Sequence, residues 1–307
     1  MGFSREASSK EVLTVSREKI SRAHTDLRRL SAFYREVYGD MASVREVLRI
    51  LGRSGGEPGS VKASELYTRS LDCQNHGGYP MLERIASVAA VCGVPGAGMR
   101  VLDVGCGVGG PGRFLADRYH CRVIGVDLVP ERVEAAKALT RLTGLAAQVR
   151  YRQADAAALP FPDRAFHQVW MLDAGVHVRD KRTLFGELGR VLKPAGLLVL
   201  HDQLGLPPAM RPVVRRAPYF APTLAQLLRH LEWAGFRLLA WQDTTAQTVA
   251  YMRQRGDRRA QRQSKSATAV DERYQPAIQL RDAYLEALTV QGSRTGVLVA
   301  GRMGTSP

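Results

Sequence analysis

The amino-acid sequence predicts an α/β fold built on a seven-stranded, mostly parallel sheet with helices on both faces. From residue 100 onward, short β-branched runs alternate with amphipathic helical segments, as in repeated βαβ units. A glycine-rich turn at residues 105–110 separates the first such run from the first helix. The chain has 307 residues, of which 45% are hydrophobic, so it is long enough to bury the core of such a sheet.

The first 60 residues are predicted to form a helical N-terminal appendage. Apolar residues recur at helical spacing among charged ones from residue 10 to residue 51. The stretch 52–60 is rich in glycine and serine, which is typical of a linker. We therefore expect the main domain to span residues 61–307.

Within this main domain the pattern predicts a Rossmann-like order of strands and helices. The predicted strands are residues 100–104, 122–126, 148–153, 168–172, 197–200, 236–241 and 295–301. The predicted helices are residues 81–92, 111–119, 130–142, 181–192 and 223–234. Two segments interrupt the alternation, the proline-rich 203–222 and the helical 244–291. Ligands bind at the carboxyl ends of the strands in such sheets. We therefore expect both insertions to form a cap over the ligand site and to bind or gate a second ligand, the acceptor of a transferred group.

Charge and cysteine content narrow the class of protein. The net charge of +15 is large, and its densest run comprises Arg253, Arg255, Arg258, Arg259, Arg262 and Lys265. No aromatic residues interleave with this run, so a solvated helix face is favoured over a nucleic-acid footprint.

The four cysteines follow no zinc or disulfide spacing, and we predict no metal site. No apolar stretch approaches the length of a membrane span, and we expect a cytoplasmic protein.

Several spaced motifs follow one another along the chain. Asp103 precedes Gly105, Gly107 and Gly109, which completes the pattern D-x-G-x-G-x-G. Gly105, Gly107 and Gly110 by themselves also match the dinucleotide pattern G-x-G-x-x-G. The stretches 123–127 (VIGVD), 153–156 (QADA), 159–163 (LPFPD) and 190–196 (RVLKPAG) come after it. In this order they resemble the motifs of class I S-adenosylmethionine-dependent methyltransferases, over about residues 65–245.

This resemblance implies S-adenosylmethionine as cofactor and S-adenosylhomocysteine as product. It implies that Asp103 lies near the methionine ammonium, that Asp127 binds the ribose hydroxyls and that Asp155 receives the adenine amino group. A carboxylate suits the ribose because it accepts two hydrogen bonds from a diol. The full set of expected cofactor residues is Tyr67, Tyr79, Asp103, Gly105, Gly107, Asp127, Leu128, Asp155, Ala156, Met171 and Leu172.

Residues 166–181 resemble a segment of the subfamily that includes tocopherol, sterol, ubiquinone-type and natural-product sugar methyltransferases. In similar sugar O-methyltransferases a histidine at the place of His177 deprotonates the acceptor, with an aspartate at the place of Asp202. Such a carboxylate would fix the tautomer of the imidazole. The alternative is that His177 bonds a loop and Asp202 is a turn residue. His76, within an H-x-G-Y element, is a second candidate base, or it bonds the methionine carboxylate or the backbone.

Together these features predict methyl transfer to a small-molecule acceptor of secondary metabolism, with O-methylation slightly favoured. One alternative is C- or N-methylation of a small aromatic or isoprenoid acceptor. A nucleic-acid methyltransferase is a weaker alternative, since its base-binding motif is missing after the fourth predicted strand. A binding protein that senses the cofactor without catalysing a reaction is a third alternative. The sequence leaves open whether the chain forms a homodimer.

Overall fold

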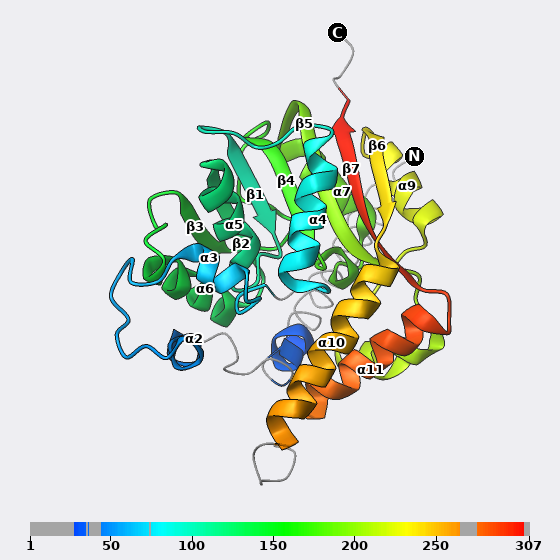
Figure 1. Ribbon diagram of the computed structural model, residues 1–307. Coiled ribbons are helices and arrows are strands. Elements are labelled where there is room, and N and C mark those ends of the chain that lie inside the picture. The colour runs from blue at the N-terminus through cyan, green and yellow to red at the C-terminus, as the bar shows by residue number, and fades with distance from the viewer. Residues whose placement is uncertain (1–27, 35, 37–43, 74, 265–274, 304–307) are drawn as a thin grey trace, which may run out of the picture.

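The computed structural model describes residues 28–34, 36, 44–73, 75–264 and 275–303 of the chain (Figure 1). Its centre is a seven-stranded sheet in the order β3-β2-β1-β4-β5-β7-β6. The strands are β1 (Arg100–Val104), β2 (Arg122–Asp127), β3 (Val149–Gln153), β4 (Phe166–Leu172), β5 (Leu192–Leu204), β6 (Phe236–Asp243) and β7 (Arg294–Arg302). Only β7 runs against its neighbours, β5 and β6. The predicted fold class is confirmed.

Strand β5 begins five residues before the predicted strand. Leu192 already pairs with Phe166, and after a register shift Leu197 pairs with Gln168. The residues between them bulge, and Ala195 adopts a left-handed φ of 58°. The sequence prediction ended a helix with a turn here, because the Lys-Pro-Ala-Gly stretch resembles a helix stop rather than a bulged strand.

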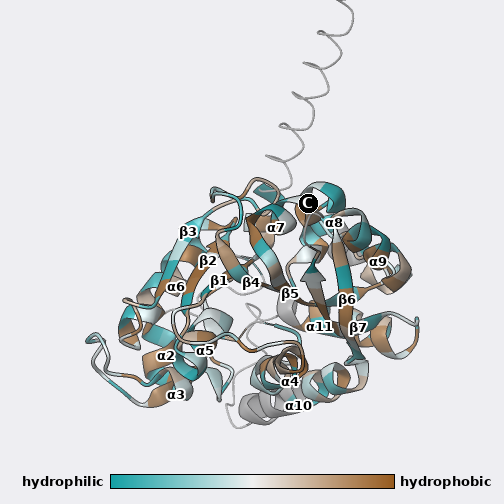
Figure 2. Cartoon of the chain, turned by 90° about the horizontal axis from the view of Figure 1, so that it is seen from above, coloured by the Kyte–Doolittle hydropathy of each residue, from teal (hydrophilic) through white to brown (hydrophobic). Residues whose placement is uncertain are grey.

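The side chains of the strands contribute to two cores, one on each face of the sheet. Along β1, Val101 joins one core, whereas Leu102 and Val104 join the other. The first core is covered by α4 (Gly78–Ala90), α5 (Gly110–Tyr119) and α6 (Pro130–Leu142). The second is covered by α7 (Lys181–Val191) and α9 (Leu224–Trp233). Figure 2 shows the row of strands with α7 on one side and α4 and α5 on the other.

The cap lies beyond one end of the sheet, the end to which the β1 arrow points in Figure 1. It comprises η2 (Pro208–Met210), α8 (Arg211–Arg216), α10 (Thr245–Ser264) and α11 (Gln275–Thr289). These elements come from the two predicted insertions. Helical residues 28–34 complete the cap, because Leu30 and Phe33 pack in one apolar cluster with Tyr219 and Tyr284.

The N-terminal segment is therefore partly integrated into the main domain. Helix α2 (Val44–Leu51) packs through Val47 against Leu139 and Leu142 of α6. Residues 1–27, where the appendage was also predicted to be helical, lie outside the described residues. So do the side chains of the basic run from Arg255 to Lys265. Among the helices described, none is long and apolar enough to cross a membrane.

Candidate active site

The glycine loop after β1 turns sharply to start α5. Gly105, Gly107 and Gly109 have left-handed φ angles of 69°, 55° and 84°, which other residues adopt only with strain. The backbone N–H groups of Gly105 and Cys106 donate to the carbonyl oxygen of Val126, at 2.8 and 2.9 Å. A Cβ on Gly107 would lie 2.6 Å from the Arg132 guanidinium. Glycine is therefore needed to keep the loop open.

A cavity of about 1180 Å³, counted with its open mouth, lies over this loop. Ten of the predicted site residues line it: His76, Gly105, Gly107, Asp127, Leu128, Asp155, Ala156, Met171, Leu172 and His177. They come from the carboxyl ends of four neighbouring strands, β3, β2, β1 and β4, and from the segment before α4. The structure thus brings most of the predicted cofactor residues together.

Two acidic side chains stand side by side in the cavity, at the ends of adjacent strands. Asp127 accepts hydrogen bonds from the N–H groups of Gly107 and Val129, both at 2.9 Å. Asp155 accepts one from the N–H of Ala157 at 2.8 Å. These backbone donors fix the orientation of the two carboxylates, whose remaining lone pairs can accept from a hydroxyl or an amino group.

Three of the predicted cofactor residues do not line this cavity. Asp103 is buried beneath the glycine loop, and burial together with repulsion by Asp127 raises its pKa to about 7. The rings of Tyr67 and Tyr79 stack on each other with their centroids 5.3 Å apart. Their hydroxyls donate to Asp117 and Glu83, at 2.8 and 2.6 Å. Carboxylates on α5 and α4 therefore hold both rings away from the cavity, contrary to the prediction.

The predicted base pair of His177 and Asp202 is not formed. His177 Nδ1 lies 2.7 Å from the carbonyl oxygen of Pro218, which can only accept, so Nδ1 carries the proton. Its Nε2 then accepts from the Tyr34 hydroxyl at 3.0 Å. Asp202 accepts instead from the N–H of Val176 at 3.0 Å and does not line the cavity. The prediction was wrong because η1 (Gly175–His177) points His177 toward the cap.

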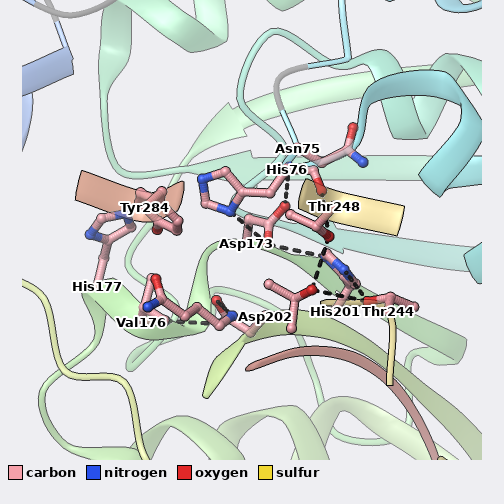
Figure 3. Close-up of polar contacts among 12 residues, drawn as sticks. Asn75, His76, Asp173, Val176, His177, His201, Asp202, Thr244, Thr248 and Tyr284 are labelled. Atoms are coloured by element: carbon pink, nitrogen blue, oxygen red, sulfur yellow. Dashed lines mark hydrogen bonds and ion pairs between the residues drawn. The ribbon is translucent and has the colours of Figure 1, made fainter. Parts of the chain in front are cut away.

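Asp173 connects two histidines at the end of β4 (Figure 3). One carboxylate oxygen accepts from the backbone N–H of His76 at 2.6 Å. The other lies 3.2 Å from His76 Nδ1 and 3.1 Å from His201 Nδ1. Burial by itself would raise the pKa of Asp173, but attraction to the two imidazoles outweighs burial and lowers it well below its usual range. Asp173 is therefore a carboxylate at neutral pH.

Aromatic side chains of the cap complete the cavity. The Tyr284 ring lies against the ring of His76, with 4.3 Å between centroids, and Figure 3 shows both beside His177. Tyr219 meets His177 edge-on at 5.6 Å. The Arg132 guanidinium lies 4.2 Å from the centroid of the Tyr34 ring. The part of the cavity beyond the glycine loop is thus lined by phenol and imidazole groups.

Sequence reasoning missed the roles of Asp173, Tyr34 and Tyr284 in this cavity. Asp173 belongs to the segment that resembled the subfamily, but it pairs with a histidine 97 positions earlier, and no motif spacing reveals such a pair. Tyr34 and Tyr284 come from predicted amphipathic helices, in which aromatic residues usually belong to the core. Among the described residues, no three His, Cys, Asp or Glu side chains are grouped to hold a metal ion.

The cavity suits S-adenosylmethionine. Asp127 and Asp155 present acceptors at the ends of β2 and β3, as the donors of a nucleoside, hydroxyls and an amino group, require. Asn75 Oδ1 is buried at the cavity without a hydrogen-bond partner among the described residues, so it offers a further acceptor. A mostly parallel sheet with a glycine loop after β1 and acids at the ends of β2 and β3 defines an α/β protein that binds a nucleoside cofactor.

Comparison with known proteins identifies the family. Residues 101–196 match a family model described as a methyltransferase domain. An O-methyltransferase, cnsE, of Penicillium expansum is 32% identical over 222 residues, which cover 65% of this chain and 80% of that protein. A 2-methyl-6-phytyl-1,4-hydroquinone methyltransferase of Synechocystis is 45% identical over 105 residues, 34% of this chain and 32% of that protein. The match with this relative thus spans about a third of its length.

The fold agrees with this comparison. The crystal structure of a putative sarcosine dimethylglycine methyltransferase from Galdieria sulphuraria superimposes with a TM-score of 0.69 at 18% identity, covering 86% of this chain and 98% of that one. The chain belongs to the class I S-adenosylmethionine-dependent methyltransferases.

Proposed function

We propose that this protein transfers the methyl group of S-adenosylmethionine to the hydroxyl of a small molecule. One observation carries the proposal: a single cavity joins the glycine loop and Asp127 to the His76–Asp173 pair. The cap covers this cavity with Tyr34, Tyr219 and Tyr284, which favours a small acceptor over a nucleic acid. The Penicillium relative is named an O-methyltransferase, which supports oxygen as the acceptor atom.

When bound, S-adenosylmethionine supplies a methyl carbon attached to a positively charged sulfur, and the acceptor displaces the sulfur in line. The chain must hold the acceptor oxygen in line and remove its proton. His76 is the proposed base. Asp173 faces His76 Nδ1, so it fixes the tautomer with the proton on that nitrogen and stabilises the imidazolium that forms. His201 lies on the far side of Asp173 and holds the carboxylate in place. Its other nitrogen, Nε2, lies 3.2 Å from the Thr244 hydroxyl, and neither residue lines the cavity.

The charges around the acceptor end favour a neutral acceptor. Asp173 is engaged by two imidazoles and the His76 N–H. Arg132 lies 3.8 Å from Asp127 and over the Tyr34 ring. The other side chains there are apolar or aromatic, including Leu30, Phe33 and Leu280. A phenol or alcohol on a weakly polar skeleton, as in secondary metabolites, therefore fits better than a phosphate or an ammonium compound.

The aromatic lining also supports a second candidate, carbon methylation of an aromatic or isoprenoid acceptor. Tyr34, Tyr219 and Tyr284 present ring faces and edges that can stabilise positive charge developing on such a skeleton. The name of the Synechocystis relative specifies a hydroquinone, which carries both a ring carbon and hydroxyls. The position of the new methyl group on the product distinguishes the two candidates.

The test is formation of S-adenosylhomocysteine with a panel of phenols, hydroquinones and alcohols, followed by variants of the base pair. We expect His76→Gln and Asp173→Asn each to lower kcat by about 10²- to 10⁴-fold, the usual contribution of a general base. The affinity for S-adenosylhomocysteine should stay within about threefold, because neither change removes a cofactor contact proposed above.

His230→Gln is the matched control, since His230 lies on α9 and does not line the cavity. It should leave kcat unchanged. Wild-type turnover in both His76→Gln and Asp173→Asn would contradict the proposed base.

A further inference from the structure

Asn75 carries a buried acceptor that the fold itself does not use. The residue is 7% exposed and lines the cavity. Its Nδ2 donates to the carbonyl oxygen of Gly78 at 3.1 Å, whereas its Oδ1 has no partner among the residues that the structure describes. An unpaired buried acceptor destabilises a protein, so a persistent one is expected to serve a ligand.

The direction of the Asn75 amide is determined by its partner. The Gly78 carbonyl oxygen can only accept, so the NH₂ group must face it and Oδ1 must face the other way. The backbone is held as well, because the N–H groups of Gly77 and Gly78 donate to the Asn75 carbonyl oxygen at 2.8 and 3.1 Å. The ligand group that meets Oδ1 must therefore be a hydrogen-bond donor.

The position of Asn75 along the sheet indicates which donor this is. Its neighbour His76 bonds through its backbone N–H to Asp173, so this segment crosses the end of β4. Asp155 and Asp127 follow β3 and β2, on the opposite side of β1. If these acids hold the adenine and the ribose, the amino-acid end of the cofactor extends over β1 toward β4, where Asn75 lies.

The segment before Asn75 is packed directly on the glycine loop. A Cβ on Gly110 would lie 2.3 Å from the backbone oxygen of Asp72, so the two backbones touch. Asp72 also lines the cavity, and its fully buried carboxylate is paired with the Arg113 guanidinium at 2.9 Å. A carboxylate of the ligand would need donors, and one N–H of the Asn75 amide already bonds Gly78, whereas Oδ1 is the side-chain atom of Asn75 that has no partner among the described residues.

From these observations we infer that Asn75 Oδ1 accepts a hydrogen bond from the α-ammonium group of the methionine moiety of S-adenosylmethionine. An ammonium has three N–H donors and no acceptor, which matches the single acceptor that Asn75 presents. The inference rests on the proposed function only in requiring that this cofactor occupies the cavity. It assigns Asn75 to the cofactor and leaves the base to His76.

The test compares two ligands by isothermal titration calorimetry on the full chain. S-adenosylhomocysteine carries the amino-acid group, and 5′-deoxy-5′-methylthioadenosine lacks it. We expect Asn75→Ala to lower the affinity for S-adenosylhomocysteine by about 10- to 100-fold, as for a lost hydrogen bond to a charged group. The affinity for methylthioadenosine should change by less than about threefold. Asn75→Asp keeps an acceptor for the ammonium but loses the donor to the Gly78 carbonyl oxygen, so it should bind S-adenosylhomocysteine more tightly than Asn75→Ala does.

Each outcome decides between the explanations. Equal weakening of both ligands by Asn75→Ala would show a structural role through Gly78 and overturn the inference. Unchanged S-adenosylhomocysteine affinity would overturn it too. If the wild type binds neither ligand, the proposed function fails instead.

Discussion

His177 shows how a single residue can be recognised correctly as part of a site and yet have different partners from those expected. It lines the cavity, but its two ring nitrogens bond Pro218 and Tyr34 rather than Asp202. Burial lowers its pKa to about 4, and nearby positive charges on Lys181 and Arg132 act in the same direction. The ring is therefore neutral at pH 7, with Nε2 as an acceptor.

This pKa shift predicts a pH dependence of stability. A histidine titrates near 6.5 in the unfolded chain, so between pH 6.5 and pH 4 the unfolded state binds a proton that the folded state does not. The contribution of neutral His177 is therefore complete above pH 6.5 and is lost as the pH falls toward 4. Between pH 6.5 and pH 4 the free energy of unfolding of the wild type should therefore fall by about 3 kcal/mol more than that of His177→Gln.

Urea unfolding at a series of pH values measures this difference. Other groups with a shifted pKa, including Asp103 and Asp202, are present in both proteins, so their contributions to the pH dependence largely cancel in the comparison. Parallel curves for the two proteins would show that His177 keeps an ordinary pKa.

At the scale of an element, the η1 turn is held by two buried ionisable side chains, Lys181 and Asp202. Lys181 Nζ donates to the carbonyl oxygens of Gly175 and Val178, at 2.6 and 2.5 Å. Asp202 accepts from the N–H of Val176, and burial raises its pKa to about 7. Asp202 thus acts on the turn that carries His177 and not on the imidazole. A Cβ on Gly175 would lie 2.8 Å from Asp202 Oδ2, which leaves no room for another residue.

We predict that Lys181→Met destabilises the protein by about 2–3 kcal/mol, because the ammonium donates to the carbonyl oxygens of both Gly175 and Val178 and the variant leaves Gly175 with only the Val178 N–H. Lys137→Met is the matched control. Lys137 lies on the surface of α6, where it makes a salt bridge with Glu134, so its loss should cost about 0.5 kcal/mol or less. Chemical denaturation of both variants measures the difference, and equal stabilities would refute the proposed support of η1.

On the scale of the whole molecule, most of the sheet could be predicted because βαβ units are encoded locally. Six of the seven strands begin within two residues of their predicted starts, and only β5 departs further, through its bulge. The positions of Asp127 and Asp155, the acids predicted to bind the cofactor, could be predicted for the same reason, because each lies at or just after the end of a strand.

The acceptor side could not be predicted in the same way, because it is assembled from distant segments. Residues 28–34, the loop with Tyr219 and helix α11 meet only in the folded chain. The pair of His76 and Asp173 likewise depends on how the segment before α4 crosses β4. The misplacement of Tyr67 and Tyr79 has a similar origin, since a motif gives the position of a residue but not the direction of its side chain.

The binding of S-adenosylhomocysteine to the full chain, measured by calorimetry, tests the central claim that this cavity holds the cofactor. We predict one bound ligand per chain and an affinity reduced by about 10- to 100-fold in Asp127→Ala, as expected for lost hydrogen bonds to a carboxylate. Asp163→Ala, which removes a carboxylate that is 71% exposed, should bind like the wild type. The account is contradicted if the wild type binds no S-adenosylhomocysteine or if Asp127→Ala binds it equally well.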